Sequence, residues 1–337
     1  MEDRLATYGR RNKSISNPLT VIITVGICLG CWSLGYLDST GLPLEPGANA
    51  TPIWRSICLL LADKDMIAYV SGCGLLFFIS FLVQRGSFLL LILKGRTLLP
   101  FLFYLLLNST NAVFFPIQST SFALLFLLAA IFELFNSYQK LVNIGRIFNA
   151  TMFIAIGSLF WVYLLWFIPL FWFGLYKFKL LNVRSFYASF LGAFTTYWFV
   201  LAWCVWKHDY SLLLIPLRSL ADIDLIFLNE TIQVGKLIPF CIIMFILIAV
   251  VVFNKIENTL RARHYLSFLL VFSIYSFLLI FLYGQDIANI LSIFYVPTSV
   301  LIAYLFSNKR GFISYLIYYG MLLVLVILFV LRLWNIL

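Results

Sequence analysis

The stretch IFNATMFIAIGSLFWVYLLWFIPLFWFGLY, residues 147–176, decides how this chain is arranged. It contains no charged residue and is 30 residues long, whereas a helix needs about 20 apolar residues to cross the hydrocarbon core of a membrane. Pro169 lies in its second half. The stretch therefore forms either one helix or a pair of short helices joined by a turn near residues 161–168.

The distribution of Lys and Arg separates these two arrangements, because cytoplasmic loops carry an excess of both residues. With one helix and a cytoplasmic N-terminus, 13 basic residues fall inside and 10 outside; with two short helices the split becomes 17 to six. The stronger bias favours a helical hairpin. Non-helical backbone at membrane depth must be buried in protein or line a wet cavity, so we expect the turn to lie within a bundle.

The composition of the whole chain fits a membrane protein. Of its 337 residues, 63% are hydrophobic and only 11% are charged, whereas soluble proteins carry about 25% charged residues. So few charges cannot cover a water-facing surface, which excludes a soluble enzyme, a disordered chain and a nucleic-acid-binding domain. The net charge of +10 is the excess expected of cytoplasmic loops and does not imply an acidic partner.

Further apolar runs flank the hairpin and have the length of single helices. They lie at residues 18–37, 66–83, 97–115, 119–138, 185–206, 237–253, 265–283, 287–306 and 312–331. Together they predict an all-α polytopic transmembrane bundle of about 11 helical segments, forming one integral membrane domain over residues 1–337. The N-terminus is predicted to be cytoplasmic and the C-terminus to lie outside.

Two external loops, residues 38–65 and 207–236, each contain an amphipathic stretch. In the second loop, SLLLIPLRSLADIDLIFL (211–228) places Arg218 and Asp222 four residues apart. In the first loop, apolar residues recur at helical spacing: Trp54, Ile57, Cys58 and Leu61. We expect both stretches to form helices that lie flat at the membrane surface.

Acidic residues are concentrated outside in this topology, where nine of the 13 fall. Glu133 lies nearest to the middle of a span and can reach the head groups or pair with Lys140 or Arg146. The scarcity of charge at mid-membrane counts against an ion-coupled transporter or a channel. The Cys28-x-x-Cys31 motif lies in an apolar helix, so we expect packing residues there, no metal site and no evident cofactor.

Three outer carboxylates are candidates for chemistry. Asp38 directly follows the first span, where a carboxylate can act as a general base; a plain interfacial aspartate is the alternative. Asp63 and Asp65 precede the second span with D-x-D spacing and are candidates for substrate binding. Acidic residues also favour a helix N-terminus, which is the alternative for this pair.

A polar run ends the span at 185–206. Lys207 and His208 beside Asp209 could bind a phosphate or move a proton, since imidazole titrates near neutrality. A simple polar stop after the aromatic end of the span is the alternative. Together with Arg218, this run completes the set of candidate substrate-binding residues.

Four stretches resemble an uncharacterised family of multi-pass inner-membrane proteins from Bacteroidota. They are RTLLPFLFYLLLNSTNAVFFP (96–116), FNSYQ (135–139), GSLFWVYLLWFIPLFWFG (157–174) and WCVWKHDY (203–210). That family has no assigned activity. The resemblance implies the cytoplasmic membrane of a diderm bacterium.

A second resemblance is to the C-type superfamily of membrane glycosyltransferases, which use polyprenyl-phosphate sugars on the outer side of the membrane. The counterparts of its acidic first loop, surface helix, paired short helices and proline-containing late helix are Asp38, 53–62, 147–176 and Pro297. This chain departs from the superfamily because Asp38 lacks the adjacent acidic partner that the first loop usually carries.

Three functions remain open at this point. The chain is a catalytically degenerate relative of those transferases that assists assembly or transport of a lipid-linked envelope polymer, with a polyprenyl-phosphate lipid as partner. Alternatively it is an active transferase, in which Asp38 deprotonates the acceptor hydroxyl while Lys207, His208 and Arg218 hold the phosphate. The third alternative is a structural membrane subunit of a larger complex.

Overall fold

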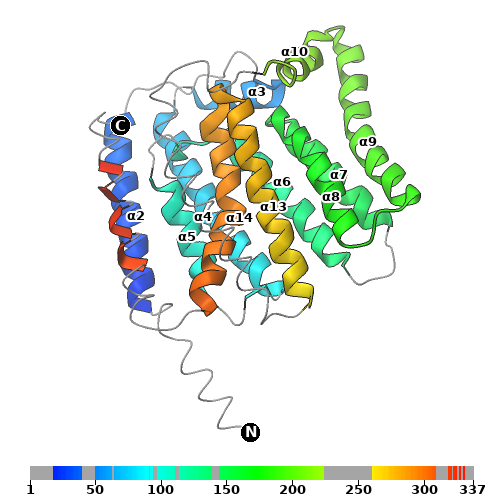
Figure 1. The fold of residues 1–337 in the computed structure, drawn as a ribbon. Coiled ribbons are helices and arrows are strands. Elements are labelled where there is room, and N and C mark those ends of the chain that lie inside the picture. The colour runs from blue at the N-terminus through cyan, green and yellow to red at the C-terminus, as the bar shows by residue number, and fades with distance from the viewer. Residues whose placement is uncertain are drawn as a thin grey trace.

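The computed structural model describes residues 18–39, 50–62, 64–90, 92–93, 97–110, 114–138, 144–223 and 260–308, and parts of a helix between residues 318 and 330. All regular secondary structure in these ranges is helical, which confirms the predicted all-α class (Figure 1). The predicted span at 237–253, part of the span at 312–331, residues 224–236 and Asp63 lie outside the described residues.

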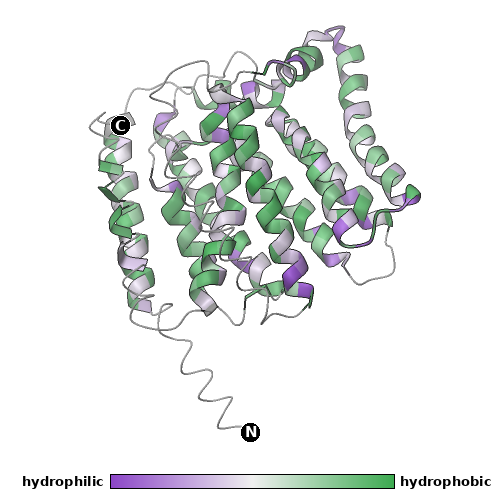
Figure 2. Ribbon diagram, viewed as in Figure 1, coloured by the Kyte–Doolittle hydropathy of each residue, from purple (hydrophilic) through white to green (hydrophobic). Residues whose placement is uncertain are grey.

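Within the described residues, six helices are long and apolar enough to cross a membrane, which fits a multi-pass membrane protein. They are α2 (Pro18–Ser39), α4 (Asp65–Leu89), α6 (Ser119–Asn136), α9 (Val183–Lys207), α13 (Leu260–Leu282) and α14 (Ile287–Asn308). Hydrophobic residues run along these helices, and hydrophilic ones gather near their ends (Figure 2).

Shorter helices complete the described part of the fold. They are α3 (Pro52–Leu61), α5 (Leu99–Asn108), α7 (Ile144–Ser158), α8 (Phe167–Lys177) and α10 (Ser211–Ser219), with 3₁₀ turns η2 (Val162–Trp166) and η3 (Gly284–Asp286). The apolar spacing predicted for the first external loop is confirmed in α3. Its Trp54 and Cys58 are buried against Ala68 of α4 and Ile117.

The stretch that decides the arrangement is broken where the sequence predicts a turn. Helix α7 ends at Ser158, η2 follows, and α8 begins at Phe167. The two ends of the stretch meet the same end of α6: Arg146 Nη1 donates a hydrogen bond to Asn136 O at 2.9 Å, and the rings of Phe178 and Phe135 lie 5.8 Å apart. The chain therefore doubles back, as the hairpin interpretation requires.

The apolar run at 97–115 is not the single helix that its length predicts. Helix α5 ends at Asn108, which is fully buried and donates its side-chain amide to Tyr104 O at 2.9 Å. The following backbone rests on α4, where Ile117 N donates to Ala68 O at 3.1 Å. Gly72 of α4 permits this approach, because a Cβ there would overlap the backbone of residues 115–117. Short polar side chains compete with helical hydrogen bonds and so end the helix inside the bundle.

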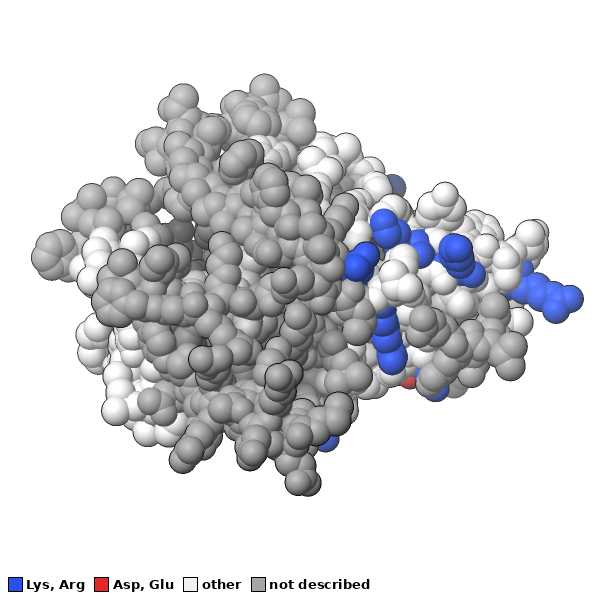
Figure 3. All heavy atoms as spheres, turned by 60° about the horizontal axis from the view of Figure 1, so that its bottom comes forward, with Lys and Arg blue, Asp and Glu red and all other residues white. Residues whose placement is uncertain are grey.

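The two ends of the bundle carry different charges. At the end where α6 finishes, the described basic residues outnumber the acidic ones, and Figure 3 shows them facing that side. We call it the basic end; it carries Arg85, Arg146, Lys177, Lys179, Arg184, Arg261 and Arg263. Its one described acid, Glu133, lies 4.0 Å from Arg146, one of its two predicted partners. The opposite end carries the described acids Asp65, Asp209, Asp222 and Asp286.

Candidate functional site

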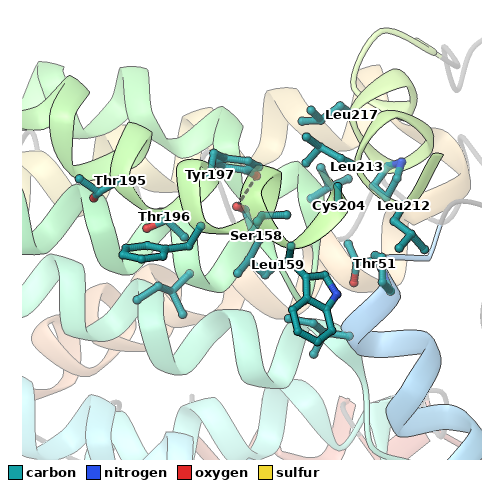
Figure 4. Close-up of a pocket in the computed structure, with 18 of the residues that line it drawn as sticks. Thr51, Ser158, Leu159, Thr195, Thr196, Tyr197, Cys204, Leu212, Leu213 and Leu217 are labelled. Atoms are coloured by element: carbon teal, nitrogen blue, oxygen red, sulfur yellow. Dashed lines mark hydrogen bonds between the residues drawn. The ribbon is translucent and has the colours of Figure 1, made fainter. Parts of the chain in front are cut away.

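A cleft of about 620 Å³ lies between α7 and α9 and is closed by α3 and α10 at the end opposite the basic end (Figure 4). Its walls are predominantly apolar, and no charged residue is among those that line it within the described ranges. Ile156 and Leu159 form one wall, Val200 belongs to the other, and Leu213 and Leu217 of α10 cover the top.

The cleft exists because α7 and α9 touch at one level and separate at the next. Gly192 provides the contact: a Cβ at this position would overlap Phe148 O and Thr151 Oγ1 of α7. Small residues allow such close approach of membrane helices. From Thr195 onward, the α9 side chains line the cleft.

Hydroxyl groups fix the floor of the cleft. Ser158 Oγ and Tyr197 OH share a hydrogen bond of 2.7 Å between α7 and α9. Thr51 Oγ1 donates to Phe160 O at 3.0 Å, and Tyr275 OH donates to Trp166 O at 2.5 Å. The bonds from Thr51 and Tyr275 satisfy the carbonyl of Phe160, just before η2, and that of Trp166, its last residue, which the irregular turn would otherwise leave unpaired in an apolar setting.

Three of the candidate residues from the sequence lie close to residues that line this cleft, at what we call its rim, without lining it themselves. Lys207 ends α9, and its Nζ lies 5.6 Å from the ring centroid of Trp203, a residue of the cleft wall. His208 takes a left-handed conformation with φ 53° and turns the chain over the cleft. Arg218 directly follows Leu217 of the cleft lining, and all three candidates are exposed.

The fourth candidate in this segment, Asp209, makes hydrogen bonds to its own loop. Asp209 Oδ1 accepts hydrogen bonds from Ser211 N at 3.0 Å and Ser211 Oγ at 2.5 Å. These bonds close a local turn directly before α10, whose N-cap residue is Tyr210. Asp209 therefore positions the helix that roofs the cleft.

Two further candidates, Asp38 and Asp65, belong to other helices. Asp38 belongs to the last turn of α2, on the flank of the bundle opposite α9 and α10 (Figure 1), and its side chain is outside the described residues. Asp65 is the exposed first residue of α4, where a carboxylate favours a helix start. The structure thus brings Lys207, His208 and Arg218 to one cleft but does not bring Asp38 to it.

One partly buried carboxylate, Asp286, is not among the candidates from the sequence. Asp286 of η3 accepts a hydrogen bond from Asn289 Nδ2 at 3.0 Å, and Asn289 Oδ1 accepts one from Thr120 Oγ1 at 3.0 Å. Burial raises the pKa of Asp286, while the hydrogen bond from Asn289 opposes this rise in part. The sequence did contain a signal for this position of Asp286. The loop Gly284–Asp286 between two apolar runs is too short to extend away from the helix ends.

Asp286 lies behind the cleft, across η2. Val162 of η2 faces the cleft, while its neighbours Trp161 and Tyr163 both lie within electrostatic reach of Asp286. The ring of Tyr163 is 4.7 Å from that of Tyr283, whose hydroxyl donates to Leu220 O at 2.6 Å and so ties the end of α10 to α13.

No group of His, Cys, Asp and Glu side chains among the described residues could hold a metal ion. No protein-family model, no curated protein and no solved structure matches this chain. The candidate site combines an apolar cleft, hydroxyl groups at its floor and cations at its rim.

Proposed function

We propose that this multi-pass membrane protein binds a lipid phosphate of the polyprenyl-phosphate class, with the chain in the cleft between α7 and α9. The phosphate lies at the rim, beside Lys207, His208 and Arg218. The observation that carries this proposal is the continuity between an uncharged apolar cleft and a cationic rim.

The surroundings of the cleft suit a lipid ligand. Outside the cleft, α9 exposes large aromatic side chains, among them Trp198 at 57% and Trp206 at 80%. Aromatic residues of this kind are typical of the level where lipid head groups begin. Each Lys or Arg near such a surface contributes about 1 kcal/mol to the attraction of an anionic head group.

The positive-inside rule supports an orientation for this site. Applied to the described charges, it assigns the basic end to the cytoplasm and the cleft to the outer leaflet. The proposed topology has about 11 helical segments, a cytoplasmic N-terminus and an external C-terminus. In the inner membrane of a diderm bacterium, such a protein would hold a lipid-linked envelope intermediate on the outer side and assist its assembly or transport.

The test is binding of a short-chain polyprenyl phosphate to the purified full chain, followed by native mass spectrometry. The double variant Lys207→Ala, Arg218→Ala should lose about 2 kcal/mol of binding, roughly 30-fold. Lys64→Ala is the matched control, because Lys64 is exposed at the same end but precedes α4 and belongs neither to α9 nor to α10. Binding that survives unchanged in the double variant contradicts the proposal and favours a structural subunit of a larger complex.

Glycosyl transfer is the second candidate activity, and the position of Asp286 favours it. In this alternative Asp286, a partly buried carboxylate with a raised pKa that lies across η2 from the cleft, accepts the proton of an acceptor hydroxyl. The acceptor oxygen then bonds to the sugar carbon, the bond from that carbon to the phosphate oxygen breaks, and the lipid phosphate leaves beside Lys207 and Arg218. Asp286→Asn should abolish transfer but not lipid binding. Asp38→Asn tests the role proposed for Asp38, and unchanged transfer excludes it.

A further inference from the structure

A second space opens at the basic end, between α4 and α6. Near the opposite end the two helices pack together through Ala68, Leu75 and Phe122. Toward the basic end they separate and leave a cleft of about 320 Å³, which we call the wedge. Leu82 and Phe132 are among the side chains of its two walls.

The back of the wedge is formed by the core of the bundle. Leu269 of α13 and Val296 and Val300 of α14 line it, although each is at most 4% exposed. The wedge therefore reaches from the lipid-facing surface to the central helices. An apolar space that opens sideways in a membrane is suited to an acyl chain.

Arg85 gives the wedge a polar mouth. It lines the wedge and also a neighbouring hollow of about 190 Å³, together with Gln84 and Thr97. The hydroxyl of Thr97 is buried and finds no hydrogen-bond partner among the described residues. The guanidinium of Arg85 likewise has no ion-pair partner within the described ranges, where Arg146 and Glu133 form the one ion pair.

A buried hydroxyl without a partner and an exposed guanidinium beside it form a place for an anion, because both groups donate hydrogen bonds. The excess of basic residues around this place also favours an anion. The basic end carries one described acid, and that acid is already beside Arg146. Lys94 and Arg96 precede Thr97 in the sequence, although they lie outside the described residues.

We propose that the wedge and the hollow together bind an anionic glycerophospholipid of the leaflet at the basic end. Its phosphate pairs with Arg85, an oxygen of its head-group region accepts the hydrogen bond of Thr97, and one acyl chain fills the wedge. This site uses other helices and the other end of the bundle, so it is independent of the polyprenyl-phosphate cleft.

The experiment compares phosphatidylglycerol with phosphatidylcholine in mixed micelles with the purified full chain, and follows thermal unfolding and retained lipid by native mass spectrometry. Phosphatidylglycerol should raise the unfolding temperature of the wild type more than phosphatidylcholine does. Arg85→Gln should weaken phosphatidylglycerol binding about fivefold, while Arg184→Gln, an exposed basic residue of the same end outside the wedge, should leave it unchanged.

Two further variants separate the contribution of the acyl chain to binding from that of the charged head group. Ala129→Phe fills the wedge and should reduce phosphatidylglycerol binding with the charge intact, whereas Thr97→Val removes the unpaired hydroxyl and should weaken binding of the head group. Wild-type affinity for phosphatidylglycerol in Arg85→Gln overturns the proposal, as does equal affinity for phosphatidylcholine. Inorganic phosphate that competes as well as the lipid also overturns it, because the wedge would then contribute nothing.

Discussion

Ser158 and Tyr197 join α7 to α9 through a hydrogen bond of 2.7 Å at the floor of the apolar cleft between these helices. Ser158 also donates to Ala155 O at 2.6 Å, so the tyrosine hydroxyl is the partner that a substitution can remove cleanly. This bond holds the two helices together just where they begin to separate.

Removal of this bond should loosen the cleft without unfolding the protein. Tyr197→Phe is expected to cost about 1 kcal/mol of stability, within the range of interhelical hydrogen bonds in membranes. Ser158→Ala should cost a similar amount, and the double variant should cost little more than either single one. Thermal unfolding of all four proteins measures this cycle, and strictly additive losses would show that the two hydroxyls do not interact.

Substitution at Gly192 should destabilise the protein more than loss of the bond between Ser158 and Tyr197. Gly192→Val places a side chain against Phe148 O and Thr151 Oγ1, and we expect a loss of about 2 kcal/mol through overpacking. Gly74→Ala is the control, because nothing lies within 4 Å of a Cβ at that helical position. The control should be neutral or stabilising by up to about 1 kcal/mol. Equal unfolding temperatures for the two variants would contradict the proposed origin of the cleft.

The state of Asp286 should appear in the pH dependence of stability. Because burial raises its pKa in the folded protein, its contribution is fully present below the unfolded value of 3.8 and is lost as the pH rises through the folded value. Asp286→Asn stays neutral, so it should unfold on the order of 2 °C above the wild type at pH 7. The difference should vanish below pH 3.8, and a wild type that is the more stable at pH 7 would show that the folded protein favours the charged carboxylate.

The hairpin could be predicted because it depends on the distribution of charge. Lys177, Lys179 and Arg184 follow the apolar stretch and gather at the same end as Arg146. The buried face of α3 followed from the spacing of Trp54 and Cys58. Both are local signals that require no knowledge of neighbouring helices.

Which helices lie next to one another could not be predicted from the sequence. A hydropathy pattern does not state which helices stand side by side, so it could not reveal that Asp38 and Arg218 lie on opposite flanks. The end of α5 at Asn108 depends on the contact between Gly72 and the backbone after the break. Asn289, which donates to Asp286, accepts a hydrogen bond in turn from Thr120, which comes from a distant part of the chain.

The central claim is that the chain doubles back at η2, which puts Arg184 on the cytoplasmic side and Tyr210 outside. Labelling of single cysteines with a membrane-impermeant maleimide in spheroplasts tests it, in a background where the six native cysteines are replaced. Tyr210→Cys should react in intact spheroplasts and Arg184→Cys only after permeabilisation. Reaction of Arg184→Cys in intact spheroplasts would show that this end of α9 lies outside. It would contradict the proposed orientation of α9, and with it the position of the cleft on the outer side.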